Sequence, residues 1–463
     1  MKTFGEILRK HIEQSGFNIY QYARRTGINR VNIQRYIANQ RTPDPEVFAV
    51  LMEHLQLQPP EKQELETTYE ISKVGKELYF QRLSVKELIE SVSLIYKNEK
   101  QMETYSQTIL ANSCYPFVSH RKKDTCVVSG FVNVLYLFQR ELGRNALAFE
   151  NPFAYLFLPP DPRHTFMDAW LVPAKPRQND MLKITQIFPL AKVNMRPKSQ
   201  SHNLHVISSI LPLCLSTHFQ YEAYFYYDDP LNDQNYGILY PYYAILKDCV
   251  ILFSQDMKSA LLSFDPAMVQ LYQIRFQKHL LHCQEIVQTT DHFLPQESGV
   301  RSFASTALFP QYHVNYAPYL ADIVAPQASD IPHYHFFTRQ GLFNFTKYGI
   351  CSGMLPFPEK AVSPEDRRAL LTHLCDICKT GPPILHIINP NTFCIPENLN
   401  LNVTEETAYL LNYTEHSSWN CISIQESGIR SALADFLSFL PESPYVYTKE
   451  QTFAIIKEIV EKI

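Results

Sequence analysis

Two short stretches of the sequence carry side chains that could bind a metal ion. The stretch "HLCDIC" contains His373, Cys375 and Cys378, which could supply soft ligands to zinc or form a redox pair of thiols. Because leucines recur around these cysteines at helical spacing and no second CxxC pair supplies a fourth ligand, we interpret them as core residues. His333 and His335 share one side of an extended "HYH" segment, which by itself supplies only two ligands. We therefore expect neither a metal nor a cofactor.

The motifs of the common catalytic chemistries are absent from the sequence. It contains no G-x-x-x-x-G-K-[ST], H-E-x-x-H, G-x-S-x-G or G-x-G-x-x-G. These motifs anchor phosphate-binding loops, zinc proteases, serine hydrolases and dinucleotide sites. We therefore assign no catalytic residue and expect that the protein is not an enzyme.

The first 43 residues are strongly basic, although the whole chain of 463 residues has a formal net charge of -4. They contain eight basic and two acidic residues, a net charge of +6. Residues 44–70 reverse this balance, with one basic and seven acidic residues and a net charge of -6. Such a segregated basic surface on the first helices is typical of proteins that bind nucleic acid.

The elements that carry this basic surface are predicted to be helices. Apolar residues recur at steps of three and four up to residue 70, with breaks at Gly16, Gly27 and Pro43. Asn18 and Asn29 are expected N-caps, and Asp44 followed by proline is expected to begin the next helix. The pattern predicts about five short helices in a compact all-α domain over residues 1–72.

Four positions in this domain predict a helix-turn-helix. Ala23 is small enough for two helices to cross closely, and Gly27 can adopt the conformation of the turn. Ile33 and Tyr36 are apolar and would fill the angle between the helices. We interpret all four as the core of the motif, which orients its second helix.

The stretch "NIYQYARRTGINRVNIQRYIANQRTPDPE" resembles the Cro/phage-repressor-like family of helix-turn-helix proteins, also called XRE-type regulators. The resemblance covers residues 3–70 and includes the "R-T-P" exit into the next helix. The chain departs from the family pattern at two positions, because the family usually has Gln where Ile19 stands and Gly where Asn39 stands.

The resemblance implies that the second helix of the motif enters the major groove of double-stranded DNA. Arg30, Val31 and Gln34 would then contact base edges, through guanine, a thymine methyl and adenine respectively. A second set would contact the phosphate backbone or the groove wall: Arg24, Arg25, Asn32, Arg35, Asn39 and Arg41. The alternative for these arginines is a solvated helix face that binds nothing.

One helix-turn-helix reads about half of a useful operator, so we expect a homodimer on a pseudo-palindromic site. Residues 73–110 are predicted to form a helical linker, and their apolar positions approximate a heptad that Gln81 interrupts. This helix either connects the domains and packs on its own C-terminal part, or forms the dimer.

The rest of the chain is predicted to be a large α+β region, so the fold class is multidomain. We place a sensor or oligomerisation subdomain at residues 111–300 and a second α+β subdomain at residues 301–463, without an internal repeat. The tyrosine-rich segments 219–227 and 236–246 are predicted strands that either line an aromatic pocket or form ordinary sheet core. "CVILFS" and "ALLSF" predict a hairpin, followed by an amphipathic helix.

The stretch from Cys249 to Leu280 resembles the hairpin and D-x-x-x-V-x-x-Y-x-x-x-F helix of phospholipase-D-like effector domains, which are fused to some bacterial regulators. The H-x-K-x-x-x-x-D motif of their catalytic members is missing, because "HRKKD" from His120 to Asp124 has a different spacing. The resemblance thus implies a scaffold that binds a ligand without cleaving it.

These observations together predict a cytoplasmic, sequence-specific transcriptional regulator. No apolar run is long enough to span a bilayer, no secretory signal precedes the first helix, and the ten cysteines lack the spacing of a disulfide framework. The expected partners are double-stranded DNA, a second copy of the chain and a small-molecule or peptide effector, with no membrane. The alternatives are an enzyme or toxin-like effector with an autoregulatory head, and a protein-protein adaptor.

Overall fold

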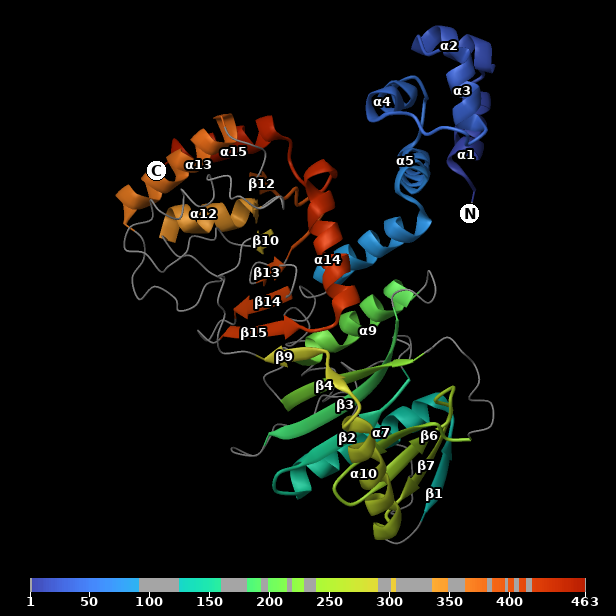
Figure 1. The fold of residues 1–463 in the computed structure, drawn as a ribbon, viewed down its shortest axis with the longest axis vertical. Helices are drawn as coiled ribbons and strands as arrows, with labels where there is room; N and C mark the ends of the chain where they lie inside the picture. The colour runs from blue at the N-terminus through green and yellow to red at the C-terminus, as the bar shows by residue number, and fades with distance from the viewer. Residues whose placement is uncertain are drawn as a thin grey trace. The chain divides into compact units, whose positions relative to one another are not determined.

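The computed structural model describes residues 2–90, 125–159, 181–192, 199–214, 219–228, 239–289, 301–304, 335–348, 363–380, 385–395, 399–403, 408–413 and 419–462. The chain divides into two compact units, an N-terminal unit of Met1–Leu83 and a C-terminal unit of Ser84–Ile463. The first is helical and the second combines sheets with helices, as predicted (Figure 1). No helix among the described residues is both long and apolar enough to cross a membrane.

The N-terminal unit contains α1 (Phe4–Gln14), α2 (Ile19–Thr26), α3 (Arg30–Ile37), α4 (Pro45–Glu53) and α5 (Pro59–Val74). The expected N-caps are confirmed. The Asn18 side chain accepts a hydrogen bond from the Gln21 amide at the start of α2, and the Asn29 side chain accepts one from the Val31 amide at the start of α3. Asp44 precedes α4, whose first residue is a proline. These signals are local in sequence, which is why the helix starts were predictable.

The core of the N-terminal unit is held together by apolar packing and by neutral hydrogen bonds. The rings of Phe48 and Tyr69 stack with their centroids 3.8 Å apart, and Phe4 packs beside them. The buried Tyr22 hydroxyl donates to the Leu51 carbonyl at 2.6 Å, which links α2 to α4. Burial raises the pKa of Tyr22 well above its ordinary value, so this hydroxyl stays a donor.

The first sheet of the C-terminal unit has the order β1-β7-β6-β5-β2-β3-β4-β8. Strands β2, β3 and β4 are parallel to one another, and β5, β6 and β7 form an antiparallel meander beside β2. The strands are β1 (Cys126–Ser129), β2 (Phe153–Phe157), β3 (Leu182–Ala191), β4 (Phe219–Asp228), β5 (Tyr242–Ile245), β6 (Val250–Phe253), β7 (Ser259–Ser263) and β8 (Gln284–Glu285). Helices α7 (Phe131–Ala148) and α9 (Ser199–Cys214) pack on one face, and α10 (Pro266–Leu280) packs on the other.

The second sheet has the order β12-β11-β10-β13-β14-β15-β9. Its strands are β9 (Val287–Thr289), β10 (Arg301–Ala304), β11 (His335–Phe337), β12 (Leu385–Ile387), β13 (Leu399–Val403), β14 (Ala408–Tyr413) and β15 (Trp419–Ile424). Helix α14 (Ser427–Phe439) packs on one face, and α12 (Arg339–Tyr348), α13 (Pro364–Thr380) and α15 (Lys449–Val460) pack on the other (Figure 1). A short 3-10 helix, Leu440–Glu442, follows α14.

The two sheets are built by one topology used twice. In each, three parallel strands follow an edge strand, and a three-stranded antiparallel meander then leads into a helix. We call β1 to α10 the first repeat and β9 to α14 the second repeat. The Ile286 amide donates to the Ala223 carbonyl of β4, and its carbonyl accepts from the Gln425 amide, so one residue joins the two sheets. The expectation of no internal repeat is wrong, because the repeat lies in strand order.

The tyrosine-rich segments form strands, as predicted, and the two strands are not neighbours in the sheet. Both segments contain a strand, β4 and β5, but β2 and β3 lie between them. Tyr243 of β5 packs edge-on against Tyr272 of α10, and Tyr226 of β4 lies 4.6 Å from the His279 ring. These aromatic side chains therefore form sheet core under α10. The predicted hairpin and the helix after it are confirmed as β6, β7 and α10.

The predicted helical linker lies partly outside the described residues, which stop at residue 90 and resume at residue 125. Residues 76–90 are helical, and Val85, Leu88 and Ile89 are buried in the main core of the C-terminal unit. Lys86 forms an ion pair with Glu90 at 2.7 Å. This part of the helix packs on its own chain, which was one of the two alternatives.

Candidate nucleic-acid interface

Helices α2 and α3 are joined by a tight turn at Gly27. Gly27 ends α2 in the left-handed conformation, with φ of +72°, a region that favours glycine. Ala23, Ile33 and Tyr36 are buried between the helices, as predicted. Gly27 itself is exposed and nothing lies near the position of its missing Cβ, so its assignment to the core is wrong. It acts through the backbone conformation of the turn.

The end of α3 is fastened to the start of α1 by Asn39. Its side-chain oxygen accepts from the Gly5 amide at 2.9 Å, and its side-chain amide donates to the Thr3 hydroxyl at 3.0 Å. Asn39 has φ of +54°, a conformation that asparagine tolerates better than most residues. A Cβ on Gly5 would lie only 2.1 Å from the Ile37 carbonyl oxygen. The family's usual glycine at position 39 indicated that Asn39 would need an unusual backbone conformation. Nothing in the sequence indicated that Asn39 would contact Gly5.

The side chains predicted to read bases all lie on the outer face of α3. Arg30, Val31 and Gln34 are exposed, and Val31 is 51% exposed although it is apolar. The opposite face of the same helix carries the buried Ile33 and Tyr36. An eight-residue helix thus turns one side to the core and presents a guanidinium, a methyl pair and a carboxamide to solvent. All three kinds of group are among those that recognise base edges.

The residues predicted to contact phosphate differ in their surroundings. Arg24, Arg25, Arg35 and Arg41 are exposed, and Asn32 is half-buried. The Arg25 guanidinium lies 5.0 Å from the centre of the Phe17 ring. Both ends of the Asn39 amide are engaged inside the unit, which leaves this residue a structural role that the sequence did not predict.

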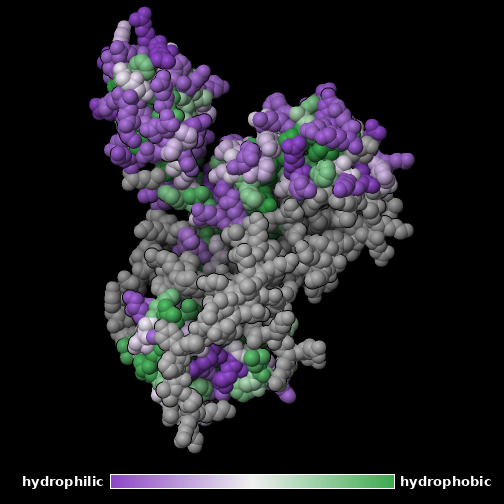
Figure 2. Space-filling model, turned by 180° about the vertical axis from the view of Figure 1, so that it is seen from behind, coloured by the Kyte–Doolittle hydropathy of each residue, from purple (hydrophilic) through white to green (hydrophobic). Residues whose placement is uncertain are grey.

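The arginines of this surface are largely without counter-charges. Residues 14–43 contain five arginines and no acidic residue. Within the described residues 2–83, Arg24, Arg30 and Arg35 form no ion pair, while Arg41 pairs with Asp44 at 3.5 Å. Figure 2 shows that the face of this unit in view is mostly hydrophilic. Exposed guanidinium groups without partners create a positive field over α2 and α3.

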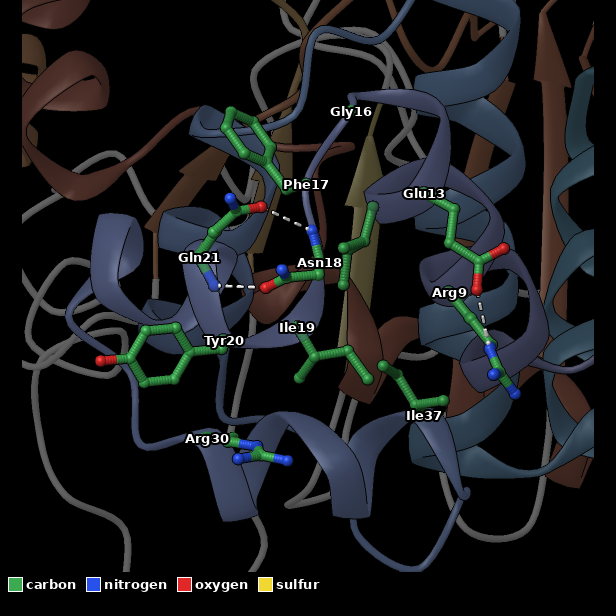
Figure 3. A pocket seen from close by; sticks show the side chains of 11 residues that line it. Arg9, Glu13, Gly16, Phe17, Asn18, Ile19, Tyr20, Gln21, Arg30 and Ile37 are labelled. Carbon is green, nitrogen blue, oxygen red and sulfur yellow. Dashed lines mark hydrogen bonds and ion pairs between the residues drawn. The ribbon is translucent and has the colours of Figure 1, made fainter.

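A cleft opens between the end of α1, the start of α2 and the start of α3 (Figure 3). Ile19 and Ile37 form its floor, the exposed Tyr20 lies on one rim, and Arg30 lies at its α3 side. The reciprocal cap between Asn18 and Gln21 satisfies their two backbone amides.

The backbone amides of Ile19 and Tyr20, between Asn18 and Gln21, stand at the first two positions of α2 and have no carbonyl acceptor within the helix. The positive end of a helix beside an arginine suits an anion such as phosphate. Sequence reasoning missed this cleft, because its lining comes from three helices.

The candidate metal ligands do not converge in the part of the chain that the structure describes. Cys375 and Cys378 lie on α13, and burial raises the pKa of the Cys378 thiol to about 11. The side chains of His373 and His335 and the whole of His333 lie outside the described residues. Among described side chains, no group of three or more His, Cys, Asp or Glu could hold a metal ion. The described cysteines are free thiols.

Comparisons with known proteins place the chain in no family. No family model and no curated protein matches its sequence. Among solved structures, the archaeal chromatin protein TrmBL2, for which a mode of DNA binding is described, is 13% identical with a TM-score of 0.22. The match covers 61% of this chain and 98% of that one. A likeness at this TM-score carries no weight for the fold or the function of this chain.

Proposed function

We propose that the chain is a sequence-specific DNA-binding regulator that inserts α3 into the major groove. One observation carries the proposal: α3 exposes Arg30, Val31 and Gln34 on the face opposite its buried Ile33 and Tyr36. The Arg30 fork can bond guanine O6 and N7, and the Gln34 carboxamide can bond adenine N6 and N7. The resemblance of this segment to the Cro/phage-repressor-like family supports the same reading.

The phosphate contacts are proposed to come from the residues around α3. Arg24 and Arg35 have no counter-charge within the described residues 2–83, so each can neutralise a phosphate without breaking an ion pair. The amides at the start of α2 provide a second anion site, in the cleft beside Arg30. Such contacts set the register on the duplex without reading its sequence.

The protein is proposed to act as a homodimer, because a single recognition helix covers too few base pairs for specificity. Two copies related by a two-fold axis would read a pseudo-palindromic operator with half-sites about one helical turn, or 34 to 36 Å, apart. The C-terminal unit would supply the dimer contact or sense an effector. We assign no chemistry to it, in keeping with the absence of catalytic motifs from the sequence.

The proposal is tested by incubating the full-length protein with fragmented genomic DNA at physiological salt and sequencing what it retains. An enriched pseudo-palindrome is the expected result. On that site, Arg30→Ala and Gln34→Ala should each weaken binding by about 1 to 3 kcal/mol and relax the base preference at one position per half-site. Uniform recovery of all fragments would contradict the proposal.

A matched control separates base reading from general charge. Lys62→Ala also removes one positive side chain from the N-terminal unit, but Lys62 lies on the acidic α5 and pairs with Glu66 at 3.8 Å. Its affinity for the enriched site should stay at the wild-type value. If Arg30→Ala loses as much affinity on random DNA as on the enriched site, Arg30 does not read a base.

A further inference from the structure

The outer side of α10 in the first repeat exposes a stripe of apolar side chains. Leu271, Ile274 and Leu281 are 63%, 48% and 82% exposed, and Leu281 directly follows the last residue of the helix. Together with the exposed Lys278 they stand at positions i, i+3, i+7 and i+10. This is the spacing at which one helix contacts another along its length. The inner side of α10, with Val269 and Phe276, is buried against the sheet.

The second repeat shows how the counterpart of this helix is covered. Helix α14 follows its meander as α10 follows the first, and both begin at an acidic N-cap, Glu426 and Asp265. Ala432 and Leu271 occupy the same position relative to the N-cap of their helices. Ala432 is buried, whereas Leu271 is exposed. Helix α14 is in contact with α9, and buried residues of both helices belong to one core. The outer side of this helix position is thus a packing surface in one repeat.

The opposite end of the two repeats is closed by a charged helix. Helix α15 packs on α13 through Ile456 and Ile459, which share a core with Leu371 and Leu374. Its outer side carries charged residues that are exposed: Lys449, Glu450, Lys457, Glu458 and Glu461. A head-to-tail contact of α10 with this end of another copy would bury these charges, which is costly.

We propose that α10 is the dimer contact of this protein and that it packs against α10 of a second copy, antiparallel across a two-fold axis. This inference rests on the proposed function, which requires two copies, and it identifies the surface that joins them. Pairing like with like uses the apolar stripe on both copies and closes the assembly at two chains. The pairing would also bury Leu271, Ile274 and Leu281 against a neighbouring helix, as α14 is packed against α9.

Charge selects the antiparallel direction. When the two stripes are centred on position 276, Leu271 faces the second copy's position 281, and Ile274 faces its position 278. The basic Lys278 and Arg275 then face the second copy's Ile274 and Gln277, so no two cations are opposed. A parallel pair would set Lys278 against itself and Arg275 against itself, and like charges directly opposed destabilise a helix pair. The apolar stem of Lys278 can cover Ile274 while its ammonium reaches solvent.

The first test is the oligomeric state of the full-length chain. The wild type should sediment as a dimer, and the double variant Leu271→Asp with Ile274→Asp should sediment as a monomer with the circular dichroism spectrum of the wild type. Val132→Asp is the matched control, because Val132 is an exposed apolar residue on α7 of the same unit. It should remain a dimer. A wild-type monomer, or a dimeric double variant, would overturn the proposal.

The second test restores the contact and reports its direction. Leu271→Asp and Leu281→Lys should each weaken the dimer, and a mixture of the two variants should form a heterodimer. In the antiparallel pair the new aspartate faces the new lysine, while the remaining Leu271 faces the remaining Leu281. In a parallel pair neither variant side chain would meet the other. Failure of the mixture to associate would refute the antiparallel contact, and it cannot be caused by misfolding if each variant keeps the circular dichroism spectrum of the wild type.

DNA binding distinguishes this inference from the function it rests on. With the pseudo-palindrome recovered from genomic fragments as probe, the monomeric double variant should lose about 100-fold or more in affinity, because the second half-site contact is no longer intramolecular. Its affinity for a single half-site should be unchanged. If the wild type forms dimers that require Leu271 but binds no DNA, the proposed function is refuted and the α10 contact stands. If dimers bind the palindrome and the Leu271 variants remain dimeric, the α10 contact is refuted and the proposed function stands.

Discussion

Arginine has opposite roles in the two units of this protein. In the C-terminal unit, Arg144 donates to both oxygens of Asp248 at 2.5 and 2.9 Å and to the buried Glu141 at 2.7 Å. Arg140 bonds the other oxygen of Glu141 at 2.6 Å. Burial lowers the pKa of Arg144, but its hydrogen bonds to Asp248 and Glu141 outweigh this effect and raise it above its ordinary value.

The N-terminal unit holds itself together by other means. Its interior bonds join neutral groups, such as the hydroxyls of Tyr22 and Tyr69 with backbone carbonyls. Within its described residues, Arg24, Arg30 and Arg35 lie on the surface without an ion pair. Removing an arginine should therefore destabilise the C-terminal unit and leave the stability of the N-terminal unit nearly unchanged, and the difference identifies the arginines that are available to a ligand.

The largest expected effect comes from removing the carboxylate between the C-terminal arginines. Glu141→Ala leaves Arg140 and Arg144 without their shared partner, and a broken buried pair costs about 3 to 5 kcal/mol. The two arginine side chains are each 31% exposed, which places the expected loss near the lower end, about 3 kcal/mol. Urea denaturation of the C-terminal unit measures it.

The control for Glu141 is an ion pair of the N-terminal unit. Glu13→Ala removes the partner of Arg9, 3.0 Å away, in a pair whose side chains are both mostly exposed. An exposed pair contributes about 0 to 1 kcal/mol. If both variants lost the same stability, the ionic network would not be what distinguishes the units.

The second effect concerns the frame that presents the free arginines. A Cβ at Gly5 would meet the Ile37 carbonyl oxygen at 2.1 Å, so Gly5→Ala must push α1 away from the end of α3. Overpacking of this kind costs about 1 to 3 kcal/mol. Gly143→Ala is the control, since nothing lies near its missing Cβ within a helix, and it should stabilise the protein by about 0.5 to 1 kcal/mol. Equal thermal shifts of the two variants would show that α1 and α3 are not in tight contact.

The parts of this frame that sequence reasoning predicted are those with local signals. Asn18 and Asn29 cap their helices through residues two and three positions away, and Gly27 ends α2 by its own conformation. Ile33 and Tyr36 follow from helical spacing alone. The contact of Gly5 with Asn39 joins residues 34 positions apart, and no pattern in one sequence relates them.

The repeat in the C-terminal unit escaped prediction for a physical reason. Strand order depends on which strands pair, and pairing is set by burial on both faces of a sheet. Helix α14 is covered on two sides and α10 on one, so corresponding positions such as Ala432 and Leu271 carry different residues. Two copies of one topology can thus lose their sequence similarity, because the residue type at each position depends on the local packing.

A third and smaller effect tests whether the N-terminal unit depends on neutral bonds. The Tyr69 hydroxyl donates to the Pro43 carbonyl at 3.0 Å, and Tyr69→Phe should cost about 1 kcal/mol at neutral pH. Burial, and then the charges of Glu70 and Asp44, raise the pKa of Tyr69 to about 12. Tyrosine in the unfolded chain ionises near pH 10, so the stability contributed by this group is complete below pH 10 and is lost as pH rises to 12.

The measurement for Tyr69 is the free energy of unfolding of the N-terminal unit between pH 8 and pH 12. The variant should lose less stability than the wild type over the upper half of this range. Tyr20→Phe, at an exposed ring, serves as the control and should follow the wild type. A Tyr69→Phe curve parallel to the wild type would show that the hydroxyl bond does not hold α5 to the turn.

The smallest effect on stability is expected for Arg24 and Arg35 of the N-terminal unit. These variants test directly whether these arginines differ in role from the ion-paired arginines of the C-terminal unit. Arg24→Ala and Arg35→Ala remove exposed side chains without ion pairs, so each should change the free energy of unfolding by less than about 0.5 kcal/mol. Each should also lower the slope of log affinity against log salt by about 1, because one fewer counterion is released from DNA. Binding titrations at several salt concentrations measure this slope. An arginine that changes stability while the slope stays constant belongs to the fold, as Arg144 does, and one that changes the slope alone belongs to the interface.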